Sequence, residues 1–167
     1  LAPIAEGLET VSSASGDTLK FVGVFAGCEY VSSSTGKKVF SNYWPGSGAD
    51  TNFDIIGFVY DNPMQRFVIC SDASLTDKAT AIATIFEGAE FSAESGKGAA
   101  DGSTTTGISA AQLDVSTVDA SDLSHPLKIV GILDDPENKD FTAAGIPLIV
   151  MINNHALLAG SAEATVS

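Results

Sequence analysis

Short runs of apolar, β-branched and aromatic residues, separated by turn residues, make up most of the chain after residue 18. Such runs, bounded by Gly, Pro, Asn, Asp and Ser, predict short strands. The gaps between most of them are shorter than the ten or so residues that a crossover helix requires. The sequence therefore predicts an all-β protein, an antiparallel β-barrel or sandwich. The predicted strands are residues 19–26, 29–31, 37–43, 53–60, 65–70, 127–133 and 147–153.

Three connecting segments add detail to this pattern. The turn sequence Asp61-Asn62-Pro63 separates the runs 53–60 and 65–70, which predicts that these two strands form a hairpin. Residues 76–86 mix Ala and Lys with Thr and Ile, which predicts a short helix or turn leading into a strand. Residues 92–107 are rich in Gly, Ser, Thr and Ala and predict an exposed loop.

The first 18 residues differ from the rest of the chain. An apolar cluster that includes Pro3, Ile4, Leu8 and Val11 is followed by Ser and Gly, a composition poorly suited to independent packing. We therefore expect residues 1–18 to form an extended N-terminal arm and residues 19–167 to form the barrel or sandwich domain. The arm is either an edge strand or frayed terminus, or a segment that docks on a neighbouring molecule. The N-terminus lacks the charged start and apolar middle of a signal peptide.

Charge narrows the choice of partners. The 167 residues contain 21 acidic and 8 basic side chains, for a net charge of −13, and Arg66 is the only arginine. Nucleic-acid binding requires clustered Lys and Arg, so we expect no nucleic-acid partner. Anionic membrane surfaces are disfavoured for the same reason. No apolar run approaches the roughly 18 residues that span a bilayer, so we expect no membrane partner.

The residues that usually carry metal or redox chemistry are sparse. Cys28 and Cys70 lie in apolar runs, which predicts buried free thiols, with a single bridge between them left open. His125 and His155 share no metal-ligand spacing, and we expect His155 to be a hydrogen-bonded structural residue. The acidic stretch 134–140 lacks the spacing of an EF-hand loop. We expect no metal site.

Catalytic motifs are missing too. The sequences Gly36-Lys37-Lys38 and Gly96-Lys97-Gly98 fail the P-loop pattern, and Gly46-Ser47-Gly48 is not a nucleophile elbow. The abundance of carboxylates makes any one pair undistinctive. We expect no cofactor, no catalytic residues and no enzymatic activity. Tyr43 and Trp44 are the remaining candidates, as a sugar-stacking platform, a partner contact or an aromatic cluster that closes a barrel end.

Several sequence segments, taken in order, resemble a known family. These segments are residues 21–30, 35–45, 106–109 with 113–114, 127–131 with 136–138, and 150–155. Their order is similar to that of the head decoration, or capsid cement, proteins of tailed bacteriophages. The resemblance covers most of the chain, from about Phe21 to His155. The loop 92–107 is an extension beyond the family pattern.

This resemblance implies a β-rich structural virion protein without catalytic residues. Such a protein would bind the outer face of the major capsid protein lattice, bridge neighbouring capsomers and stabilise the shell on the outer surface of the capsid. Decoration proteins often sit at local symmetry axes, which allows a dimer or trimer on the shell. The acidic composition is compatible with an external position and keeps the free protein soluble.

A cement protein needs contact area spread over several partners. We expect the arm to supply it by ordering on a neighbouring molecule, with anchors at Pro3, Ile4, Leu8 and Val11 and second candidate contacts at Tyr43 and Trp44. The main alternative is a carbohydrate- or receptor-binding β module on a virion or cell surface, which predicts ligand binding that is lost on Trp44→Ala. A small hydrolase is a third option and requires a titrating acid pair in a cleft.

Overall fold

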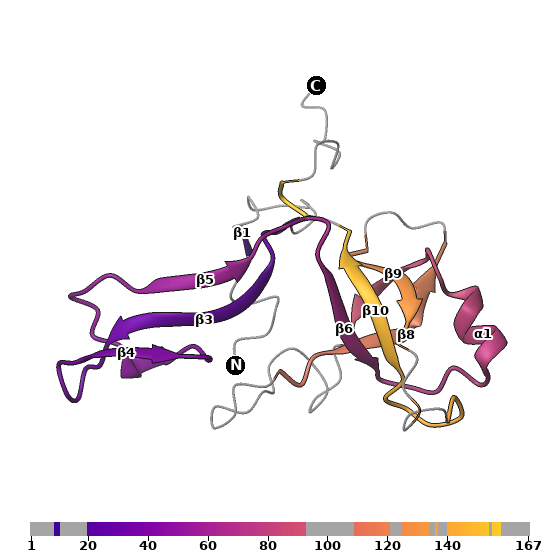
Figure 1. Ribbon diagram of the computed structural model, residues 1–167, viewed down its shortest axis with the longest axis horizontal. Coiled ribbons are helices and arrows are strands. Elements are labelled where there is room, and N and C mark those ends of the chain that lie inside the picture. Colours follow the sequence, from indigo (N-terminus) through magenta and orange to yellow (C-terminus); the bar gives the residue numbers. More distant parts are fainter. Residues whose placement is uncertain are drawn as a thin grey trace.

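The computed structural model confirms the predicted all-β class. It describes residues 9–10, 20–92, 109–120, 125–133, 136, 140–153 and 155–157. Two groups of strands lie side by side along the long axis of the molecule (Figure 1). The elements in chain order are β1 (Glu9–Thr10), β2 (Lys20–Phe21), β3 (Val24–Val31), β4 (Lys38–Ser41), the 3-10 turn η1 (Gly46–Gly48), β5 (Ile56–Tyr60), β6 (Arg66–Ser71), α1 (Lys78–Ala83), β7 (Gly88–Phe91), β8 (Gln112–Asp119), β9 (Leu127–Ile132) and β10 (Pro147–Ile152).

Five strands close into a barrel in the order β10-β6-β8-β7-β9. All neighbouring pairs are antiparallel except β6 and β8, which run parallel with Cys70 opposite Gln112. A parallel pair needs a long crossover connection, and the chain between β6 and β8 supplies one because it contains α1 and β7.

Alternating side chains fill the barrel. In β6, Ile69 is buried while Val68 and Cys70 are exposed, as expected for a strand with one face on the core. The inward residues form one continuous apolar cluster, which comprises Ile69, Leu75, Ala81, Ala89, Leu113, Leu127, Ile129, Ile146, Leu148 and Val150.

The strands β4, β3 and β5 form a separate three-stranded sheet with its own small core. Cys28, Tyr30 and Ala49 are its buried residues, and Phe25, Val39 and Ile55 pack against them. The predicted hairpin between residues 53–60 and 65–70 is wrong. β5 pairs with β3, whereas β6 pairs with β10 and β8, so the turn at Asp61–Gln65 carries the chain from one sheet to the other. Periodicity predicts a strand but does not identify its partner.

The helix predicted within residues 76–86 is confirmed as α1, which leads through Phe86 into β7. Asp77 caps it, because its side chain accepts a hydrogen bond from the Thr80 N–H at 2.7 Å.

Part of the predicted arm is described. β1 pairs antiparallel with β2, with Glu9 opposite Phe21 and Thr10 opposite Lys20. Residues 1–8 and 11–19, and with them the candidate anchors Pro3, Ile4, Leu8 and Val11, lie outside the described residues. The predicted loop 92–107 also lies outside them apart from Ser92.

Candidate docking surface

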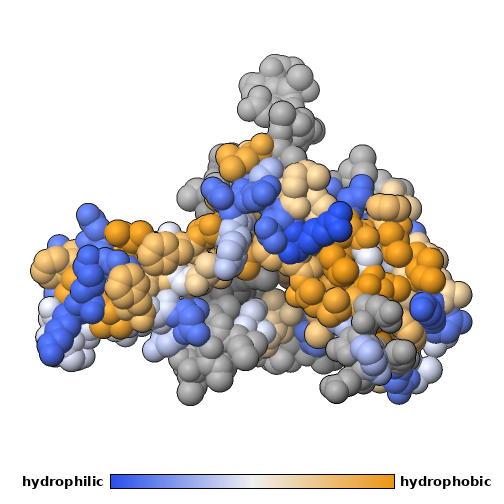
Figure 2. All heavy atoms as spheres, viewed as in Figure 1, coloured by the Kyte–Doolittle hydropathy of each residue, from blue (hydrophilic) through white to orange (hydrophobic). Residues whose placement is uncertain are grey.

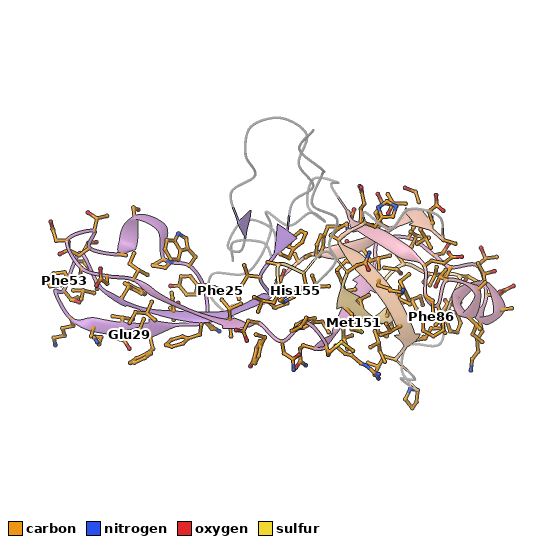
Figure 3. All side chains as sticks on the ribbon, turned by 90° about the horizontal axis from the view of Figure 1, so that it is seen from above. Phe25, Glu29, Phe53, Phe86, Met151 and His155 are labelled. Atoms are coloured by element: carbon orange, nitrogen blue, oxygen red, sulfur yellow. The ribbon has the colours of Figure 1, made fainter. Side chains whose placement is uncertain are left out.

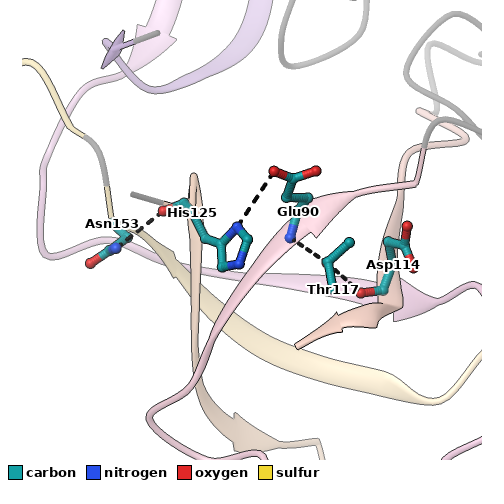
Figure 4. A network of polar contacts seen from close by, with 5 residues as sticks. All are labelled: Glu90, Asp114, Thr117, His125 and Asn153. Atoms are coloured by element: carbon teal, nitrogen blue, oxygen red, sulfur yellow. Dashed lines mark hydrogen bonds and ion pairs between the residues drawn. The ribbon is translucent and has the colours of Figure 1, made fainter. Parts of the chain in front are cut away.

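A cluster of polar contacts links strands of the barrel (Figure 4). His125 Nδ1 lies 3.5 Å from Glu90 Oε1, and the Asn153 side-chain amide donates to the His125 carbonyl at 3.1 Å. The Glu90 N–H donates to Thr117 Oγ1 at 2.9 Å, and that hydroxyl donates to the Asp114 carbonyl at 2.8 Å. These bonds join β7 to β8 and fix the segment that leads into β9, so the cluster has a structural explanation.

His155 is fully buried, and its Nδ1 accepts a hydrogen bond from the Leu157 N–H at 3.0 Å. A backbone bridge joins it to Phe21. The prediction of a hydrogen-bonded structural histidine is confirmed: His155 ties the chain after β10 to β2.

Both cysteines are free. Cys28 is buried in the three-stranded sheet, its thiol donates to the Tyr43 carbonyl at 3.4 Å, and burial raises its pKa. Cys70 is exposed, so the prediction that it is buried is wrong. It alternates with the inward-facing Ile69 and Ser71 and therefore points out of the barrel.

Tyr43 and Trp44 follow β4 and belong to the three-stranded sheet rather than to a barrel strand. The half-buried Tyr43 donates its N–H to Ser41 Oγ at 3.1 Å, while Trp44 is 44% exposed. Through Cys28 and Ser41, this segment is attached to the covered side of the sheet.

The opposite side of the same sheet is apolar and uncovered. Cross-strand register places Glu29 between Phe40 and Ile56, and Phe58 and Tyr60 follow Ile56 at alternate positions of β5. Phe25 points to the covered side and Glu29 to the uncovered side (Figure 3). We call this uncovered side the outer face; its apolar residues are Phe40 (69% exposed), Ile56 (50%), Phe58 (43%) and Tyr60 (59%).

The charges of this sheet nearly cancel. Residues 24–60, from β3 to β5, contain two lysines and three carboxylates, so nearly all of the net charge of −13 resides elsewhere in the chain. On the outer face, Lys38 forms an ion pair with Glu29. The three-stranded sheet is thus a nearly neutral, aromatic unit in a strongly acidic protein.

A pocket of about 450 Å³, open to solvent, lies along β6 and the residues that lead into β8. Its lining is largely apolar and includes Phe67, Phe91, Leu127 and Ile152, together with the exposed Cys70. Among the described residues that line this pocket there is no carboxylate or histidine.

Within the described residues, no group of three or more His, Cys, Asp or Glu side chains is arranged to bind a metal ion. None of the helices in this part of the chain has the length and apolar character needed to cross a membrane. Comparisons with family models, with curated proteins and with solved structures find no significant match.

Sequence reasoning missed the outer face. The run 53–60 reads as a strand, but its sequence does not reveal which side the loop after β4 covers. The available signal was the absence of any charge between Asp54 and Asp61, which leaves an alternating Ile56, Phe58 and Tyr60 on one face.

Proposed function

We propose that this chain is a capsid decoration protein that binds the major capsid protein lattice on the outer surface of a bacteriophage head. The observation that carries the proposal is the outer face of the three-stranded sheet, the surface with which we propose the protein contacts the shell. The resemblance of residues 21–155 to decoration proteins supplies the partner class.

Four large apolar side chains on one exposed sheet face favour a protein partner. Contiguous exposed apolar patches on soluble proteins mark interaction surfaces. Phe40, Phe58 and Tyr60 are aromatic, the residue class enriched in protein interfaces, and truncating one good buried anchor typically costs more than about 1 kcal/mol. A pleated sheet face also suits a protein surface better than a small ligand, because small-molecule sites are concave.

The charge distribution supports the same orientation. Docking a neutral face avoids the desolvation of unpaired charges. The acidic barrel would remain in solvent, where its charge keeps the free protein soluble. The arm anchors Pro3, Ile4, Leu8 and Val11 remain predicted second contacts with the shell.

Co-sedimentation with expanded shells that lack the protein tests this function. We expect saturable binding to shells and little binding to unassembled capsid subunits, because neighbouring subunits would complete the site. The double variant Phe58→Ser/Tyr60→Ser should bind at least about tenfold more weakly. Phe86→Ser is the matched control, because Phe86 is 72% exposed but lies beside α1, away from the three-stranded sheet (Figure 3).

The results of this experiment distinguish a wrong function from a wrong contact surface. If the wild-type protein does not bind shells, the decoration function is wrong. If the wild type binds and Phe58→Ser/Tyr60→Ser binds equally well, the function stands and the outer face is not the contact.

The exposed Trp44 favours a second candidate, a carbohydrate- or receptor-binding module. A glycan array on the wild-type protein and on Trp44→Ala tests it. Binding that is lost in the variant would support this alternative, and no binding by the wild type would reject it.

A further inference from the structure

The barrel wall made by β6, β10 and β9 carries two cations around an apolar centre. Met151 of β10 pairs with Arg66 of β6 on one side and with Lys128 of β9 on the other. In the next row, Ile149 lies between Val68, which is 57% exposed, and Gly131. Apolar residues gather over β6 and β10 in the space-filling view (Figure 2). We call this surface, comprising Arg66, Lys128, Met151, Ile149 and Val68, the cationic wall.

The other side of the barrel carries the opposite charge. β7 and β8 place Glu90 directly opposite Asp114, and they place Gly88 opposite Asp119. Neither strand contains a lysine or arginine. In the closed order β10-β6-β8-β7-β9, these strands lie across the barrel from β10, and they meet the cationic wall where β8 pairs with β6 and where Gly88 of β7 lies opposite Lys128 of β9. Glu90, Asp114 and Asp119 define the acidic wall.

We propose that the cationic wall binds the acidic wall of a second copy of this chain. Basic residues are scarce, at 8 of 167, yet the only arginine and one lysine flank a single methionine on this wall. Arg66 and Lys128 are two strands apart, about 10 Å. The acidic wall of a second copy presents the complementary charge on a second face formed by barrel strands.

Binding of a second copy would reduce charge repulsion on the acidic wall. Like charges directly opposite each other on adjacent strands are destabilising, and Glu90 and Asp114 stand in that relationship, although Glu90 Oε1 also lies 3.5 Å from His125 Nδ1. An arginine fork from a neighbouring copy would relieve that repulsion and form charge-assisted hydrogen bonds with carboxylate oxygens. Val68 and Ile149 would be shielded from water in the same contact.

This contact joins two different surfaces, so it is heterologous. Each copy in a pair keeps one wall free, and further copies can add side by side. The overall charge of −13 opposes association, but at about 0.15 M ionic strength the Debye length is about 8 Å, so that groups in direct contact dominate. The inference does not depend on the shell, because it concerns the free protein.

Sedimentation velocity over a range of protein concentrations tests the contact. We expect the wild-type sedimentation coefficient to rise with concentration. The variant Arg66→Glu/Lys128→Glu should weaken association at least about tenfold, as should Glu90→Lys/Asp114→Asn. The Asn retains the side-chain oxygen that accepts the Ser116 N–H at 2.8 Å. Combining all four substitutions should restore association only in part, because Glu90→Lys supplies one positive charge to face the two new carboxylates, Asp114→Asn supplies none, and Asp119 is unchanged.

A matched control separates a specific contact from a change in total charge. Lys37→Glu/Lys78→Glu changes the net charge by the same amount as Arg66→Glu/Lys128→Glu, at two exposed lysines outside both walls. This lysine control should associate more strongly than Arg66→Glu/Lys128→Glu. A third probe needs no substitution. Cys70 is exposed and pairs with Pro147 in the next row of the same wall. Coupling a polyethylene-glycol maleimide to Cys70 should therefore keep the wild-type chain monomeric.

Three results would overturn the inference. These are a wild-type protein that stays monomeric at every concentration, a cationic-wall variant that associates as well as the lysine control, and an acidic-wall variant that associates like the wild type. If the wild type stays monomeric but Arg66→Glu/Lys128→Glu loses shell binding, the cationic wall contacts the shell instead of a second copy.

Discussion

Gly23 packs against the carbonyl oxygen of Tyr60, where a Cβ atom on Gly23 would lie 2.0 Å from that oxygen. The contact joins the residue before β3 to the last residue of β5, and its cross-strand neighbour pair is Val24 and Tyr60. The close approach of the two backbones at this end of the three-stranded sheet therefore requires glycine.

Gly23→Ala should separate these backbones. We expect a loss of roughly 1–3 kcal/mol in the free energy of unfolding, since backbone atoms cannot move aside as a flexible side chain can. Hydrogen exchange should show faster exchange of β3 and β5 amides, and urea denaturation should show the lower stability. Gly36→Ala is the control: it has φ +64° but no atom within 4 Å of its Cβ, so only the backbone cost of about 1 kcal/mol applies. Equal losses in the two variants would contradict the steric explanation.

Leu148→Ala should destabilise the barrel. Leu148 is fully buried in the barrel core, so the truncation leaves a cavity and should cost about 2–5 kcal/mol in the free energy of unfolding. Val68→Ala, on the outer surface of β6, should change stability by no more than about 0.5 kcal/mol. Thermal unfolding of both variants makes the comparison, and a tolerated Leu148→Ala would mean that the barrel core is loosely packed.

The Asp77 cap should make α1 sensitive to acid. Hydrogen bonds from Thr80 lower the pKa of Asp77 below its ordinary 3.8. The folded pKa is depressed, so the cap's contribution is fully present above about pH 4 and is lost as the pH falls through the folded value. Asp77→Asn keeps a capping oxygen without a titrating group, and should therefore remove this part of the pH dependence and retain the cap at pH 7. Unfolding curves of the wild type and of Asp77→Asn, measured between about pH 2 and about pH 7, cover the range in which carboxylates titrate. If the two proteins lost stability in parallel as the pH falls, the assignment would be wrong.

The two thiols should react at very different rates. The thiolate is the reactive form, and Cys28 is both buried and shifted to a higher pKa by that burial, whereas Cys70 is exposed. A thiol reagent should modify one cysteine in the native protein and two in denaturant, with Cys70→Ser abolishing the native reaction. Rapid modification of Cys28 in the folded chain would show that the small core of the three-stranded sheet opens readily.

The strands that the sequence predicts best are those with contiguous apolar residues. β9 and β10 fall within the predicted runs 127–133 and 147–153, because neither strand has an exposed residue: β10 buries four of its six residues, and β9 buries two and half-buries the other four. β8 was not predicted. Its sequence includes Asp114, Ser116 and Thr117, since one of its sides faces solvent and takes part in polar contacts.

Pairing and exposure could not be predicted from local sequence. β6 and β10 are neighbours in the barrel although some 75 residues separate them, a relationship that periodicity does not encode. Ile56, Phe58 and Tyr60 resemble core residues by type, and only the packing of the loop after β4 determines that they remain exposed. Tyr43 and Trp44 were identified from composition, but Phe40 was not, because its exposure depends on the β3–β4 register.

Barrel closure has a consequence for synthesis on the ribosome. The three-stranded sheet is complete once Tyr60 has been translated, whereas β6 lacks its neighbour β10 until Ile152 has emerged. Domains that are complete early can fold while the remainder of the chain is still being made. The nascent chain therefore presents its aromatic sheet before its acidic barrel is complete, so that the apolar outer face is the first surface of the protein to form.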